Sequence, residues 1–119
     1  MSRGNYEDEE LEELLIKYLT EDRKTPKRIK NILIPLGLEN DIVTREMIKK
    51  SLIKNNETDD EGKAGIIITS ISREIGFKNR DDLRQVIQYD RPNPWEKENY
   101  KLVEKYKTLL KEILNEINN

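Results

Sequence analysis

The sequence predicts an all-α fold, a compact bundle of about five helices in one domain (residues 1–119), with at most a minor strand near residues 65–69. Three observations lead to this prediction. Apolar residues recur at steps of three and four in several segments, which places them on one face of a helix. Thr, Asn and Pro stand where helices begin. The length of 119 residues is enough for one modest core.

The first predicted helix extends from about residue 6 to residue 22, after a tail at residues 1–5 that we expect to be disordered. Acidic residues dominate its first turn, where the helix dipole favours negative charge. Its apolar stripe consists of Leu11, Leu14, Leu15, Tyr18 and Leu19.

Threonines predict the starts of the next two helices. Thr25 precedes Pro26, a pair typical of an N-cap and a first helical residue, and this helix is expected to end near residues 35–37. Thr44 predicts the N-cap of a third helix. An exposed loop is expected at residues 55–65, which are rich in Asn, Asp and Gly.

Two later segments complete the bundle. Residues 65–69 suit either a short strand or the start of a buried helix, and we favour helix from about Thr69. Asn93-Pro94 predicts the start of a C-terminal amphipathic helix at residues 93–117. Its apolar stripe packs against the chain's own core or forms a homodimer interface. This stripe is made of Val103, Tyr106, Leu110, Ile113 and Ile117.

Composition excludes several classes of function. The chain has no cysteine and no histidine, so it lacks disulfides, thiolate metal sites and the commonest general base. Glu61-Gly62-Lys63 resembles part of a nuclease site, but without supporting ligands it is expected by chance. We therefore expect a protein that is not an enzyme and that uses no metal and no cofactor.

No apolar run approaches the roughly 20 residues needed to cross a bilayer. A cytoplasmic protein with no membrane partner is the expectation. The abundance of Ile, Lys and Asn is typical of an AT-rich coding genome, as in bacteria, archaea and phages.

The formal net charge of −2 is distributed unevenly. Acidic residues dominate residues 1–22, whereas the charged residues of the segment 23–34 are all basic. This basic patch either contacts phosphates or forms ion pairs with the acidic first helix. It consists of Arg23, Lys24, Lys27, Arg28 and Lys30.

One segment, residues 71–87, resembles the helix-turn-helix of AraC-type transcription regulators. An apolar residue, a small residue and a second apolar residue precede Gly-Phe, and three apolar positions follow at the spacing of that motif. The matching residues are Ile71, Ser72, Ile75, Gly76, Phe77, Leu83, Val86 and Ile87. The resemblance implies two helices joined at a glycine corner, the second of which reads DNA.

The spacing has a physical interpretation of its own. A left-handed Gly76 would end the first helix, Phe77 would fill the corner, and Asn79 would cap the second helix. Arginine and glutamine side chains can read base edges in the major groove. The residues expected to contact DNA are Arg73, Lys78, Arg80, Arg84, Gln85 and Gln88.

The leading hypothesis is a small regulatory or accessory protein, bacterial or phage-borne, that binds double-stranded DNA in transcription regulation. The alternative is a helical protein-interaction module, such as a phage or plasmid accessory protein that inhibits a host factor. Asp81 and Asp82 and the overall acidity favour this alternative, because phosphates repel carboxylates.

Overall fold

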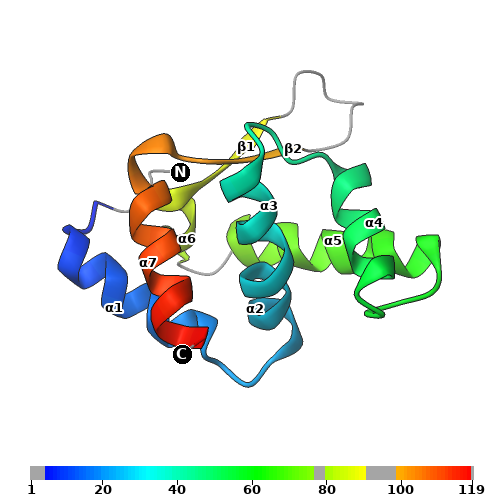
Figure 1. Ribbon diagram of the computed structural model, residues 1–119, viewed down its shortest axis with the longest axis horizontal. Helices are drawn as coiled ribbons and strands as arrows, with labels where there is room; N and C mark the ends of the chain where they lie inside the picture. The colour runs from blue at the N-terminus through cyan, green and yellow to red at the C-terminus, as the bar shows by residue number, and fades with distance from the viewer. Residues whose placement is uncertain (1–4, 77–79, 91–98, 119) are drawn as a thin grey trace.

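The computed structural model describes residues 5–76, 80–90 and 99–118, which form a mostly helical fold with a small two-stranded sheet (Figure 1). The predicted fold class is confirmed. None of the described helices is both long and apolar enough to cross a membrane. In chain order the elements are α1 (Asp8–Leu19), α2 (Lys24–Arg28), η1 (Ile29–Leu33), α3 (Ile34–Glu39), α4 (Arg45–Lys54), α5 (Glu61–Gly76), α6 (Asp81–Val86), β1 (Ile87–Asp90), β2 (Asn99–Leu102), η2 (Glu104–Tyr106) and α7 (Lys107–Asn118).

One apolar core joins these elements. α1 contributes leucines at the predicted spacing, and α5 contributes isoleucines at steps of three and four. Each buried Leu or Ile side chain stabilises the fold by about 1.5–3 kcal/mol relative to an exposed one. Among the completely buried residues are Leu11, Leu15, Ile68, Ile71, Ile75 and Leu110.

Residues 24–39 form one continuous helical run in place of the shorter helix predicted from Thr25. The N-cap is Arg23, without a side-chain hydrogen bond, and the buried Pro26 lies inside α2. The run continues through Pro35 to Glu39. A proline lacks an N–H and crowds the carbonyl four residues earlier, and the turn that precedes Pro35 is a π-helix, η1.

α5 begins at Glu61, so it replaces the predicted loop after residue 60 and the possible strand at residues 65–69. Asp60 explains the early start, since its Oδ1 accepts hydrogen bonds from the N–H groups of Gly62 (2.6 Å) and Lys63 (3.3 Å). That is the geometry of an N-cap. The isoleucine run then follows helical periodicity, with Ile68 buried and Ile66 exposed.

The small sheet lies elsewhere in the chain. β1 pairs antiparallel with β2, with Ile87 opposite Leu102 and Asp90 opposite Asn99. Val43 extends the pairing through two backbone hydrogen bonds of 2.8 Å with Tyr100.

The prediction of one helix over residues 93–117 is therefore wrong for residues 99–106, which form β2 and η2. Tyr100 and Leu102 are buried while their neighbours are half-buried, the alternation of a strand. The predicted cap at Asn93-Pro94 lies outside the described residues.

The predicted dimer stripe is used by the chain's own core. Tyr106, Leu110 and Ile113 are buried, and Val103 and Ile117 pack against the core while partly exposed. Contacts of α7 with α1 and α3 account for this apolar face without a second chain. The stripe is therefore no free surface for a homodimer.

Candidate nucleic-acid interface

The helix-turn-helix-like segment folds as α5, α6 and the start of β1. α5 extends through Gly76, and no described glycine has a positive φ, so the expected left-handed Gly76 is not found. α6 has six residues, and Ile87 belongs to β1. Residues 77–79, among them the predicted phosphate contact Lys78, lie outside the described residues.

Gln85 is turned into the protein, contrary to the prediction that it reads bases. It is 6% exposed. Its Oε1 accepts a hydrogen bond from the N–H of Tyr6 (3.0 Å), and its Nε2 donates to the carbonyl of Tyr6 and the hydroxyl of Tyr106 (both 2.9 Å). The Gln85 amide therefore joins the N-terminal segment to the C-terminal region of the chain.

Arg84 is also held within the fold. Its side chain is 13% exposed, donates to the carbonyl of Ile75 (3.1 Å) and pairs with Asp81. Asp82 is buried beside it, accepts a hydrogen bond from the N–H of Leu83, and has a pKa raised by burial. Arg84 thus does not match the predicted role of reading bases.

The other predicted DNA contacts among the described residues are Gln88, Arg80 and Arg73, and they differ in their surroundings. Gln88 is half-buried on β1. Arg80 stacks on the Tyr18 ring, with its guanidinium carbon 4.5 Å from the ring centroid, and lies 3.5 Å from a carboxylate oxygen of Glu21. Arg73 is exposed on α5. Arg73 and Arg80 are therefore the helix-turn-helix cations that line an open surface.

That surface is a hollow of about 570 Å³, here named the arginine hollow. Arg23 donates to Glu21 (2.9 Å) and to Glu74, and these bonds raise the pKa of the Arg23 guanidinium. Burial and the Glu74 carboxylate raise the pKa of the adjacent Tyr18 hydroxyl. The arginine hollow is lined by Glu21, Arg23, Thr25, Ser70, Arg73, Glu74 and Arg80.

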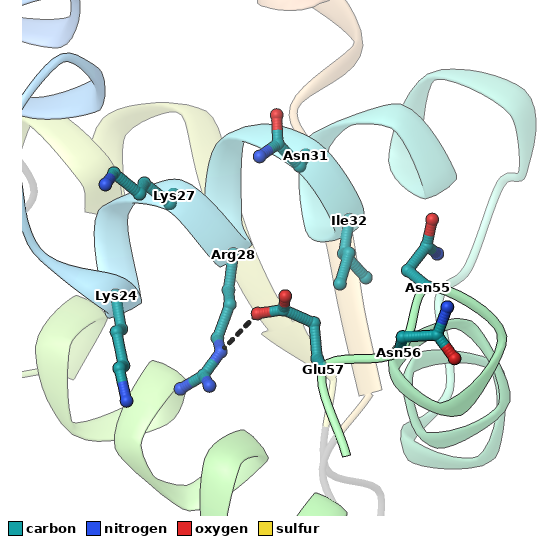
Figure 2. Close-up of a pocket in the computed structure, with 8 residues that line it drawn as sticks. All are labelled: Lys24, Lys27, Arg28, Asn31, Ile32, Asn55, Asn56 and Glu57. Atoms are coloured by element: carbon teal, nitrogen blue, oxygen red, sulfur yellow. Dashed lines mark hydrogen bonds and ion pairs between the residues drawn. The ribbon is translucent and has the colours of Figure 1, made fainter. Parts of the chain in front are cut away.

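A second hollow, of about 540 Å³, also includes residues of α2 (Figure 2). We name it the lysine hollow. α2 and η1 supply one wall, and the residues directly after α4 supply the other. It is lined by Lys24, Lys27, Arg28, Asn31, Ile32, Asn55, Asn56 and Glu57.

A Schellman motif at the end of α4 builds the second wall. The N–H of Glu57 donates to the carbonyl of Leu52 (2.9 Å), and the N–H of Asn56 donates to that of Ile53 (3.1 Å). Asn56 has a φ of 60°, a left-handed conformation that Asn tolerates. This turn directs Glu57 toward α2, where its Oε1 lies 2.9 Å from Nε of Arg28.

Ion pairing of the basic patch is incomplete. Lys27 pairs with Asp22 at 2.8 Å, and this contact lowers the pKa of the exposed Asp22 carboxyl. Within the described part of the chain, Lys24 and Arg73 form no ion pair. Lys30 is half-buried and lines neither hollow.

The acids of the first turns of α1 do not neutralise this patch. None of the described ion pairs involves residues 7–13. The partners of the patch are instead Glu21, Asp22, Glu57 and Glu74. Pairing with the end of the acidic segment, at Glu21 and Asp22, therefore accounts for part of the basic run, and the remaining pairs are with Glu57 and Glu74.

The fold brings together two sets of residues that the sequence treated separately. Arg23 of the basic patch and Arg73 of the helix-turn-helix segment line the same hollow. Sequence reasoning missed the amides of the lysine hollow and the role of Glu57. No local signal identifies them, because Arg28 and Glu57 are 29 residues apart and meet only in the tertiary structure.

Comparison with known proteins identified no relative. No family model, no curated protein and no solved structure matches this chain. The assignment of function therefore rests on the geometry of the chain itself.

Proposed function

We propose that the chain binds double-stranded DNA through phosphate contacts made by a basic face around α2. This basic face consists of Arg23, Lys24, Lys27, Arg28 and Arg73. One observation carries the proposal: cations from two segments distant in the sequence line two hollows that both include residues of α2. Six basic and three acidic side chains line these hollows, so both have a positive balance in a chain whose net charge is negative.

Phosphate contact explains this surface better than base reading does. Lysine and arginine bind phosphates regardless of sequence, whereas base reading requires a helix or strand that enters a groove. The helix that the motif assigned to the groove has its Arg84 and Gln85 bound inside the fold. We therefore propose an accessory protein with low sequence specificity in place of a reader of one operator.

Fluorescence anisotropy with a labelled mixed-sequence duplex at several salt concentrations tests this function. Lys24 and Arg73 are the cations to change, since neither pairs with an acid among the described residues. The variant Lys24→Gln/Arg73→Gln should bind about tenfold more weakly or worse at ~50 mM salt, with a salt slope shallower by about two.

The matched control is Lys50→Gln/Lys111→Gln, which removes the same charge from exposed residues that line neither hollow. It should keep most of the affinity. An absence of binding by the wild-type chain at ~50 mM salt, or equal losses in the two double variants, would exclude the proposed interface.

A second candidate is a protein-interaction module that uses α1. Its first turns carry exposed acids that enter no described ion pair, a surface suited to a partner rich in lysine. A lysine-rich peptide should then bind the wild-type chain and bind Glu9→Gln/Glu13→Gln more weakly. Equal binding by the two chains would exclude α1 as the contact.

A further inference from the structure

Lys24 and Arg28 lie one helical turn apart, so their side chains share a face of α2. Figure 2 shows both side chains extending from the same side of the helix, with Arg28 between Lys24 and Glu57. Lys24 has no ion-pair partner among the residues that the structure describes. This cation and the guanidinium of Arg28 therefore face the same space.

Glu57 fixes the direction of the Arg28 guanidinium. It engages Nε at 2.9 Å, and the Arg28 side chain is 15% exposed. No described hydrogen bond uses the two terminal nitrogens of Arg28, which leaves the end of the planar fork for a ligand. A fork of this kind binds phosphate oxygens in pairs, with geometry that a lysine alone does not provide.

The surroundings suit a small anionic group. The hollow of about 540 Å³ lies within the size range of small-ligand sites. Asn31 and Asn56 line it, and their amides make no hydrogen bond within the described residues, so both are available to phosphate or sugar oxygens. Asn31 and Ile32 belong to the π-helix η1, a rare geometry that is frequent at functional sites.

We propose that Lys24 and Arg28 form a phosphate anchor and that Glu57 is a positioning residue that aims the Arg28 fork at the phosphate. The inference rests on the proposed function and deepens it, because it names the group that the lysine hollow holds. The ligand is a phosphate group, supplied either by the DNA backbone or by a free phosphate compound.

The positioning role of Glu57 can be distinguished by experiment from the effect of its negative charge on phosphate binding. A carboxylate in a basic hollow repels phosphate, so charge alone predicts that removing it strengthens binding. Positioning predicts the opposite for Glu57→Ala, which leaves Arg28 unsupported. Glu57→Gln keeps a hydrogen-bond acceptor for Nε without the charge, and it should bind as well as the wild type or better.

The experiment measures the affinity of the folded wild type and variants for two probes, inorganic pyrophosphate and the mixed-sequence duplex. Calorimetry serves the first probe and anisotropy the second, with circular dichroism to verify folding. Glu57→Ala should weaken binding about twofold to fivefold. The control Asp59→Ala removes an exposed acid two residues away and should leave binding equal or slightly stronger.

A third variant sharpens the measurement. In an Arg28→Gln background, Glu57→Ala should strengthen binding, because only the repulsion by the carboxylate remains to be removed. Binding by Glu57→Ala that equals or exceeds that of the wild type overturns the anchor, and so does equal weakening in both backgrounds. Failure of pyrophosphate and duplex alike to bind overturns the anchor and the DNA interface together.

The two probes separate the anchor from the proposed function. Pyrophosphate binding with the expected pattern but no duplex binding supports the anchor and excludes the DNA interface. Salt-dependent duplex binding that is unaffected by Glu57→Ala keeps the DNA interface and excludes the anchor.

Discussion

α6 and α2 both carry basic side chains, but the fold uses them in opposite ways. On α6, Arg84 donates to a backbone carbonyl and Gln85 makes three hydrogen bonds in the interior. On α2, Lys24 and Lys27 remain exposed beside the lysine hollow. The difference shows that basic and amide side chains serve the fold where unpaired backbone groups lie within their reach, as at Tyr6 and Ile75, and stay available to an external anion where the helix surface is open.

The largest expected effect, on the free energy of unfolding, comes from removing the internal hydrogen bonds of α6. Gln85→Ala removes three hydrogen bonds and leaves a cavity, so the free energy of unfolding should fall by about 2–4 kcal/mol. Urea denaturation measures this change.

Duplex affinity of folded Gln85→Ala should equal that of the wild type, because Gln85 does not reach the surface. The exposed Asn115→Ala serves as a stability control and should change the free energy of unfolding by less than about 0.5 kcal/mol. A loss of duplex affinity in folded Gln85→Ala would show that α6 contacts DNA after all.

Asp82 gives a smaller effect with a defined pH dependence. Its pKa in the folded protein is raised by burial, so the folded state binds a proton more tightly than the unfolded chain does. Stability is then greatest below the unfolded pKa of about 3.9 and is lost as pH rises through the folded pKa. Asp82→Asn should remove this loss and stabilise the protein at pH 7.

Thermal unfolding of both chains at a series of pH values from about 4 to about 7 measures this difference. The two stability curves should diverge as pH rises. Asp59→Asn, which changes an exposed carboxyl, should give a curve parallel to that of the wild type. Parallel curves for Asp82→Asn would mean that burial does not disfavour the charge at this position.

The smallest expected effect on stability comes from changing an exposed cation of α2. Lys27→Gln breaks an ion pair with Asp22 whose side chains are 53% and 96% exposed, so the free energy of unfolding should be nearly unchanged. Duplex affinity should fall less than in Lys24→Gln, since Asp22 already offsets part of the Lys27 charge. Anisotropy on the two single variants tests the order, and a larger loss for Lys27→Gln would contradict it.

The structure confirms those sequence predictions that depend only on a few neighbouring residues, such as helix caps and helical periodicity. Thr44 accepts a hydrogen bond from the N–H of Met47 and caps α4 as predicted. The leucines of α1 face the core because helical periodicity places them on one side. Asp60 was overlooked as a cap, because a run of acids resembles a solvated loop as much as a helix start.

Periodicity and composition establish that this chain forms amphipathic helices around an Ile- and Leu-rich core and that residues 23–34 carry five cations and no acid. Long-range packing sets the pairing of residues 99–102 with residues 87–90 as a sheet, and the burial of Gln85. It also decided that Glu57 meets Arg28, the contact on which the proposed anchor depends. The physical reason is the same in each case: the partner lies far away in the chain, and short-range periodicity carries no information about it.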